Sequence, residues 1–450
     1  MNIRCMITMV LMSLSSFFLA SEELITSLHV EKNKITVIIN SEFKEKYLKD
    51  DFFVEYGEDI DLSSLDYSMV TMPCLMNIIS LVWFSGKTYS IESMDKDLFY
   101  SLRRLKKLFK VIYPRTTWDG ELIPGTLVVN SPSFKVSSDK RALLFSGGLD
   151  STAASFLYND KKQLLITAWG QWDLPLKDPV IWHRVKERLE SYAHRYGHTC
   201  AFIRSNYFDF LNRFKLNKLS AEILNWRIAT IEDIGWAGLT APLLYLKGYP
   251  ALSIGSSDTW DTAYPCAASP FFDGVIVCAG IRFKHEQFDL TRSDKVEYLV
   301  TTCKNKNLKK PFLTVCPKQT GHNCCKCAKC LTTILMLLLS NDDPHDYGFY
   351  SKKNKVYKNL ETLLEGILEK DTLLVDDFAF FWDLQKKVGA LKMKGLNVGD
   401  ELESLLDFDF QELMLKTREF KFQKKVLWSK LHQLFPEIEV PSRFLAQGKA

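Results

Sequence analysis

The chain has 450 residues, of which 46% are hydrophobic and 25% are charged, an ordinary composition for a globular protein of two or three domains. The net charge of +4 is mild, and the basic clusters are short and separated. A nucleic-acid partner is not indicated, because no basic stretch has the charge density and interleaved aromatic residues of a binding groove.

Residues 1–27 form an apolar N-terminal segment that imitates a secretory signal, with a mostly apolar stretch ending at Ala20. However, Phe18 stands two places before Ala20, where a cleavage site needs a small residue. We interpret the segment as a buried strand or helix, or as an artefact of a start codon upstream of Met9 or Met12, and not as a true signal. No other run approaches the roughly twenty apolar residues of a membrane span, so no membrane contact is expected.

Residues 28–140 carry short or alternating apolar runs, for example at 35–39 and 127–129. Between them, leucines recur every three or four residues over 98–111, the pattern of a helix docked on a core. The region is predicted to be a small α+β module that serves as scaffold or partner surface.

An apolar run beginning at Arg141 stops at a Ser-Gly-Gly turn, and a helix-compatible stretch follows Asp150. Glycine allows positive φ and close approach of a ligand, and the free amides of a helix N-terminus suit an anion. The hydroxyls and the carboxylate around the turn can bind phosphate oxygens and Mg²⁺. The alternative is a plain β-turn before a capped helix. The candidate nucleotide-binding residues are Ser146, Gly147, Gly148, Leu149, Asp150, Ser151 and Thr152.

Strand and helix signals alternate after Arg141, which predicts an α/β fold with a parallel sheet covered on both faces. The predicted strands lie at 164–168, 200–204 and 251–254, and the predicted helices at 180–196 and 221–246. The first strand-to-helix turn of such a sheet is where ligands bind.

Two further strand ends are expected at the same crevice, namely 169–173 and 255–261. They carry tryptophans and carboxylates that suit an adenine face and ribose hydroxyls, although rim packing is the other interpretation. Gly255 is assigned to nucleotide binding. Cations that can neutralise a polyphosphate, unless they are surface charges, are Arg282, Lys284, Arg292 and Lys295.

The SGGLDS sequence at 146–151 resembles the pyrophosphate loop of the N-type ATP pyrophosphatases, the PP-loop superfamily, which cleave ATP between the α- and β-phosphates. The resemblance implies a Rossmann-like fold of the adenine nucleotide alpha hydrolase type, ATP and Mg²⁺ as cofactors, and a cytoplasmic location. It also implies that Ser146, Gly148, Asp150 and Ser151 hold the pyrophosphate while AMP is passed to a substrate oxygen. Ser146, Asp150 and Ser151 are the catalytic candidates.

Residues 255–272 resemble the second signature of one PP-loop family, the 7-cyano-7-deazaguanine (preQ0) synthases, QueC. Asp261, Tyr264, Pro265 and Cys266 keep its outline, whereas the aspartate and arginine of the family's YPDCR are absent. The resemblance implies a C–N bond-forming ligase that adenylates a carboxylate or carbonyl oxygen of an unidentified acceptor for attack by a nitrogen nucleophile. By analogy, it suggests 7-deazapurine-type modification or antiphage defence.

Of the eleven cysteines, five fall between Cys316 and Cys330, and clustering favours a metal over disulfides. A C-x2-C-x2-C run with one more cysteine eight positions upstream matches the spacing of a structural Zn²⁺ site. The run is also similar to the zinc motif of preQ0 synthases. The candidate ligands are Cys316, Cys324, Cys327 and Cys330. Cys325 and His322 are alternative ligands, and a redox dithiol or an iron–sulfur cluster is the alternative chemistry.

The sequence thus predicts a PP-loop domain at 141–340 that ends in the zinc motif, followed by a helical C-terminal domain at 341–450 whose charged faces are surface or contact a partner protein. A PP-loop sulfurtransferase and a non-catalytic nucleotide sensor remain as alternatives to the ligase.

Overall fold

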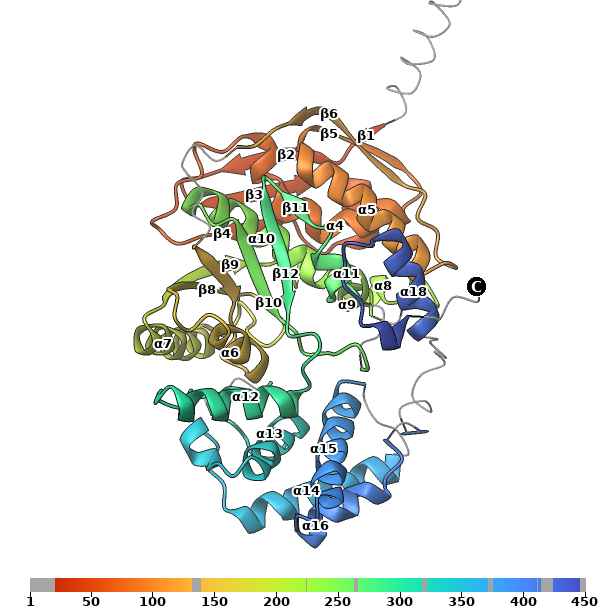
Figure 1. The fold of residues 1–450 in the computed structure, drawn as a ribbon. Helices are drawn as coiled ribbons and strands as arrows, with labels where there is room; N and C mark the ends of the chain where they lie inside the picture. The colour runs from red at the N-terminus through yellow and green to blue at the C-terminus, as the bar shows by residue number, and fades with distance from the viewer. Residues whose placement is uncertain are drawn as a thin grey trace, which may run out of the picture.

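The computed structural model describes residues 21–131, 139–223, 225–262, 266–317, 322–370, 375–410, 412–413 and 424–445. The predictions for residues 1–20, Tyr264 and Pro265 lie outside these ranges. Within them the fold is α/β, as predicted (Figure 1).

A nine-stranded mixed sheet runs through the described part of the chain, in the order β11-β12-β10-β7-β8-β9-β4-β3-β2. The five central strands, from β12 to β9, are parallel, and the strands at both edges are antiparallel to their neighbours. The strands are β2 (Ile25–Val30), β3 (Lys34–Ile39), β4 (Phe52–Glu55), β7 (Arg141–Leu144), β8 (Gln163–Trp169), β9 (Thr199–Ser205), β10 (Ala251–Gly255), β11 (Val277–Cys278) and β12 (Ile281–Glu286).

The order in which the parallel strands follow one another along the sheet reverses at β7. The chain passes from β7 to β8 and β9 on one side, and then returns to place β10 and β12 on the other side of β7. Such a switch point opens a crevice at the carboxyl ends of the two flanking strands. The buried run from Leu164 to Ala168 is typical of a strand covered on both faces.

Helices connect the parallel strands. α7 begins at Pro179 with Asp178 as its N-cap and ends at Gly197, whose φ of 71° suits glycine. The stretch 221–246, predicted to be mostly helical, contains α9 and most of α10. The helices of this region are α6 (Leu149–Phe156), α7 (Pro179–Tyr196), α8 (Arg213–Leu216), α9 (Trp226–Thr230), α10 (Glu232–Lys247), α11 (Pro270–Asp273) and α12 (Arg292–Asn305).

Residues 28–140 are mixed α and β, but they share a sheet and a core with the residues that follow. β4 pairs with β9 through Val54 and Ser205, so the antiparallel strands β2 to β4 extend the parallel sheet. A small parallel sheet, β1-β5-β6, packs at the end of the molecule that these residues form (Figure 1). The further elements are β1 (Glu22–Glu23), β5 (Thr88–Asp95), β6 (Glu121–Val128), α2 (Ser41–Tyr47), α3 (Tyr67–Val70), α4 (Met72–Phe84) and α5 (Lys96–Ile112).

The region after β12 is helical, as predicted for 341–450, but its described parts lie in two places. The helices up to η2 form a bundle beside α12, whereas α18 lies apart from that bundle, against α5 (Figure 1). Trp428 of α18 stacks on Phe271, with ring centroids 5.6 Å apart. The elements are α13 (Ala328–Leu339), η1 (Pro344–Tyr347), α14 (Lys353–Lys370), α15 (Val375–Met393), α16 (Asp400–Glu403), η2 (Ser404–Asp407), α18 (Lys424–Leu434) and η3 (Ser442–Phe444). Among the helices that the structure describes, none has both the length and the apolar character needed to cross a membrane.

Candidate active site and metal centre

The turn at 145–148 joins β7 to α6 at the switch point of the sheet. Gly147 has a φ of +75°, and its carbonyl accepts a hydrogen bond of 2.7 Å from the Thr314 amide. Gly148 is the N-cap of α6, and no side chain caps this helix. The first turn of α6 therefore keeps the uncapped N-terminal geometry that favours an anion.

Two hydroxyls stand over this turn. Ser146 Oγ lies 3.2 Å from Ser151 Oγ, and it also accepts a 3.2 Å hydrogen bond from the Gly148 amide. Thr152, in contrast, is completely buried and does not line the adjoining cavity. Its predicted contact with a nucleotide is not present in this arrangement.

A cavity of about 300 Å³ opens at the carboxyl ends of β7, β8 and β10. It brings together most of the residues predicted to bind a nucleotide, including Ser146, Gly148, Leu149, Asp150, Ser151 and Gly255. Gly147 does not face this cavity; it lines a neighbouring hollow beside α7.

Asp150 is the centre of a charge network in the cavity wall. Its Oδ2 lies 2.6 Å from Arg292 Nη1 and accepts a 3.3 Å hydrogen bond from Ser257 Oγ. Its Oδ1 lies 3.3 Å from Lys295 Nζ, on a lysine whose side chain is fully buried. Burial alone would raise the pKa of Asp150, but the positive charges of Arg292, Lys295 and Lys329 outweigh it and lower that pKa.

The structure separates the four predicted cations into two pairs. A capping box formed by Thr291 and Asp294 fixes the first turn of α12, which carries Arg292 to the cavity and the fully buried Lys295 to Asp150. Arg282 and Lys284 are exposed on β12 instead, which fits the alternative interpretation as surface charges.

Two cations near the turn were not predicted. Lys329 lines the cavity. It was not predicted because it belongs to the cysteine motif, in which only the cysteines were assigned a role. Arg188 belongs to α7 and lines the hollow beside Gly147, and its three guanidinium nitrogens are buried without a hydrogen-bond partner. Burial lowers the pKa of Arg188 to about 10 although Asp173 acts in the opposite direction. In the sequence, Arg188 looks like one of the many charged surface residues of the amphipathic helix α7, so the pattern does not single it out.

The predicted strand-end loops contribute only in part. Trp172 and Asp173 line the cavity, and Trp172 is 54% exposed. Trp169 instead stacks on Trp182, with ring centroids 5.6 Å apart. Trp260 is 4% exposed and packs in the core against Trp428, so it does not offer a face to a nucleotide.

Gly255, at the end of β10, is required by close packing. A Cβ atom placed there would lie 2.7 Å from the Asp150 carbonyl oxygen and 3.1 Å from the Ser151 amide nitrogen. The absence of a side chain therefore allows β10 to lie directly beside the first turn of α6.

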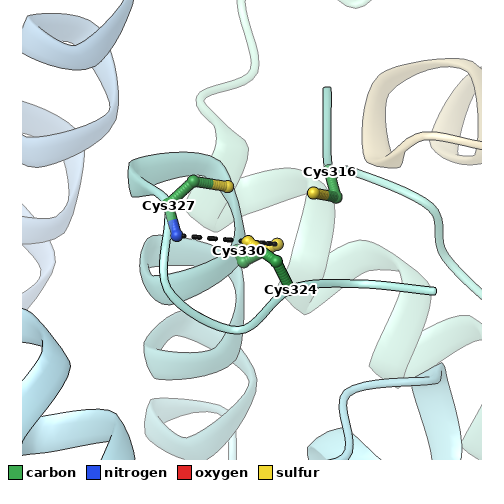
Figure 2. A group of neighbouring side chains, drawn as sticks. All are labelled: Cys316, Cys324, Cys327 and Cys330. Atoms are coloured by element: carbon green, nitrogen blue, oxygen red, sulfur yellow. Dashed lines mark hydrogen bonds between the residues drawn. The ribbon is translucent and has the colours of Figure 1, made fainter. Parts of the chain in front are cut away.

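The four predicted cysteines converge at the start of α13, where Cys327 is the N-cap (Figure 2). Their four sulfur atoms all lie within 4.8 Å of one another, and Cys324 Sγ is 3.9 Å from Cys330 Sγ. Tetrahedral zinc with Zn–S bonds of about 2.3 Å places sulfur atoms about 3.8 Å apart. The cluster can therefore hold a metal ion such as zinc.

The local backbone explains which cysteines converge. Cys325 has a φ of 54° and its Sγ donates to the Asn323 carbonyl, so it is not part of the cluster. Asn323 Oδ1 accepts from the amides of Val315 and Cys316, at 3.1 and 3.3 Å, and holds the distant cysteine in place. The hydrogen bond from Cys330 is the main cause that lowers the pKa of Cys327. Cys316 also lines the cavity, so the two sites are neighbours.

Comparison of the chain with protein-family models, with curated proteins and with solved structures found no match.

Proposed function

We propose that the protein is an ATP-dependent enzyme of the PP-loop type that forms AMP and pyrophosphate. The observation that carries this proposal is the position of the SGGLDS turn, at the carboxyl end of β7 beside the switch point and in the wall of a cavity. The doubly wound order of the parallel strands supports a Rossmann-like fold, in which this turn is the expected phosphate site.

In this proposal, the amides at the start of α6 and the hydroxyls of Ser146 and Ser151 bind the pyrophosphate. Lys329 and the cations paired with Asp150 neutralise its charge. Asp150 acts by holding Arg292 at the cavity wall and by pairing with the buried Lys295.

The donor set around Asp150 does not fit a bound Mg²⁺ ion. Both carboxylate oxygens are within 3.3 Å of a protein donor, namely Arg292, Lys295 or Ser257. The role of Mg²⁺ ligand expected for Asp150 from the sequence is therefore not part of the proposal, and no step is assigned to that ion.

The proposed reaction is a QueC-like condensation. A carboxylate or carbonyl oxygen of the acceptor attacks the α-phosphorus of ATP and pyrophosphate leaves; a nitrogen nucleophile then attacks the activated carbon and AMP leaves. Adenylation divides a difficult condensation into two easier steps. The cavity of about 300 Å³ is at the small end of the range for ligand pockets, so part of a larger acceptor would remain outside it.

We assign the four-cysteine cluster to structural zinc. Four thiolates complete a tetrahedron and leave no open position for a substrate, which is the arrangement of structural rather than catalytic zinc sites.

Sulfur transfer is the second candidate function, and one observation favours it: Cys316 lines the nucleotide cavity as well as the cluster. An iron–sulfur cluster or a carrier thiol at that position would be close to an adenylated substrate. Metal analysis separates the two functions, because zinc in a colourless protein supports the ligase and iron in a brown protein supports sulfur transfer.

The decisive experiment is a single-turnover reaction of excess protein with ATP labelled at the α-phosphate, combined with calorimetric titration of α,β-methylene-ATP. We expect the analogue to bind and the label to appear in AMP, with pyrophosphate released. Label in ADP would exclude the PP-loop reaction. Binding without any AMP would support a nucleotide sensor, and no binding would reject the nucleotide site itself.

A further inference from the structure

A second group of possible metal ligands is separate from the four cysteines. Asp233 lies in the first turn of α10, Asp273 at the end of α11 and His285 on β12. These three elements contact one another at the centre of the molecule (Figure 1). The proposed function does not use these side chains.

The three side chains are arranged as a compact triangle of donor atoms. His285 Nδ1 and Asp273 Oδ2 share a hydrogen bond of 2.7 Å, whose proton a metal ion would replace, and Asp233 Oδ2 lies 3.6 Å from the same nitrogen; the three ligand atoms are all within 4.8 Å of one another. Ligands at about 2.0–2.2 Å from a tetrahedral or octahedral ion are about 3 Å apart. The triangle therefore has the dimensions of one face of a coordination polyhedron.

Burial makes this triangle costly without a further partner. The side chains of His285, Asp233 and Asp273 are 4%, 7% and 0% exposed. Asp233 Oδ2 is a buried atom without a hydrogen-bond partner, and Asp273 Oδ1 is another. Two buried carboxylates repel each other and lose their hydration, and a single imidazole offsets only part of that cost.

We propose that Asp233, Asp273 and His285 bind a divalent transition-metal ion, for example Mn²⁺ or Zn²⁺, through two carboxylate oxygens and the Nδ1 atom of the imidazole. Mixed oxygen and imidazole donors suit such ions, whereas the thiolates of the cysteine cluster select softer ones. The inference is independent of the proposed function, because it requires neither ATP nor an acceptor.

The site lies between two hollows of the molecule. Asp233 is among the residues that line the nucleotide cavity, and His285 is among those that line a second hollow. Three protein ligands leave coordination positions for water or for a ligand in the cavity, as in catalytic rather than structural metal sites.

The test is a titration with MnCl₂ of wild-type protein that carries one equivalent of zinc, enough for the cysteine cluster alone, followed by the loss of the free Mn²⁺ signal in electron paramagnetic resonance. We expect about one bound Mn²⁺ per chain, a rise in melting temperature, and a ¹⁴N coupling from the imidazole in pulsed spectra. These measurements need no variant. Absence of binding, or bound Mn²⁺ without the ¹⁴N coupling, would overturn the proposal.

Two variants locate the ion. Asp273→Asn and His285→Gln are expected to weaken Mn²⁺ binding at least tenfold, since each removes one of three ligands. Asp383→Asn is the matched control, because Asp383 is also a buried carboxylate, 6% exposed, but it accepts from the Ser293 amide in the helical bundle. Unchanged Mn²⁺ binding in both ligand variants would place the ion elsewhere and contradict the assignment.

Discussion

Arg292 Nη1 lies 2.6 Å from Asp150 Oδ2, across 142 positions of the sequence. This ion pair joins the first turn of α6 to the first turn of α12, and Lys295 strengthens it from the same turn. The carboxylate that the sequence places beside the Ser-Gly-Gly turn is thus also a structural centre. Loss of its charge is expected to affect both the cavity and the stability of the fold.

The first prediction concerns that charge. Asp150→Asn leaves Arg292 and Lys295 buried without their counter-charge, and breaking a buried ion pair in this way costs about 3–5 kcal/mol. We therefore expect a lower midpoint in urea unfolding together with weaker binding of α,β-methylene-ATP. Glu42→Gln is the control, because Glu42 pairs with Lys46 and Lys87 on the exposed surface and should change the midpoint little. A wild-type midpoint for Asp150→Asn would show that the network does not stabilise the fold.

The second prediction tests the close approach of β10 to α6. In Gly255→Ala the new methyl group would lie 2.7 Å from the Asp150 carbonyl oxygen, so one of the two backbones must move. If the Ser-Gly-Gly turn binds phosphate as proposed, its displacement is expected to weaken binding of α,β-methylene-ATP by on the order of tenfold to a hundredfold. Calorimetric titration measures this change.

The matched control for this glycine is Gly366→Ala in α14. A Cβ atom at Gly366 meets nothing within 4 Å, so the variant should bind the analogue like the wild type. Equal affinities for the two glycine variants would contradict the role given to Gly255.

Short-range patterns in the sequence were sufficient for the Ser-Gly-Gly turn and for the cysteine cluster. An apolar run, a Ser-Gly-Gly turn and a helical stretch specify β7, the turn and α6 with little help from the rest of the chain. The C-x2-C-x2-C spacing likewise determines that Cys324, Cys327 and Cys330 meet, because all three belong to one turn and the helix after it. Cys316 was found because it is only eight positions upstream.

Relations between distant segments were not accessible in the same way. The alternating pattern at 35–39 is the same whether the strand belongs to a separate module or extends another sheet. The structure shows that it extends the large sheet, because β3 pairs with β4 and β4 pairs with β9 through Val54 and Ser205. Asp233, Asp273 and His285 come from three elements without a common motif, so no spacing announces them. Trp260 was predicted to face a nucleotide because it lies in a strand-end loop. It is instead covered by Trp428 of α18, a residue far away in the sequence.

The third prediction is a pH dependence. Burial lowers the pKa of His198 below its ordinary value of 6.5. Between 6.5 and that lowered value, the unfolded chain binds a proton that the folded chain does not, so stability is complete above pH 6.5 and falls as the pH decreases. Urea unfolding between pH about 5 and 7 should therefore show a steeper loss of stability in the wild type than in His198→Gln, which cannot titrate. Parallel curves would exclude a contribution from this imidazole.

The last prediction concerns the cysteine cluster. If the four thiolates bind structural zinc, the ion joins the segment that contains Cys316 to the start of α13. Metal binding then contributes directly to the free energy of folding. Cys327→Ser should therefore lower the zinc content and the melting temperature together, as measured by elemental analysis and by differential scanning calorimetry. Formation of AMP should fall only in proportion to the folded fraction, because no thiol takes part in adenylation.

Cys325→Ser is the control for the cluster, since Cys325 is the adjacent cysteine whose Sγ donates to the Asn323 carbonyl and does not join the other four. It should retain its zinc and lose less stability than Cys327→Ser. The opposite pattern is equally informative: a Cys327→Ser protein that keeps its metal and its melting temperature but forms no AMP would show that the thiol is chemical. Because Cys316 of the same cluster lines the cavity beside the Ser-Gly-Gly turn, sulfur transfer would then become the better assignment.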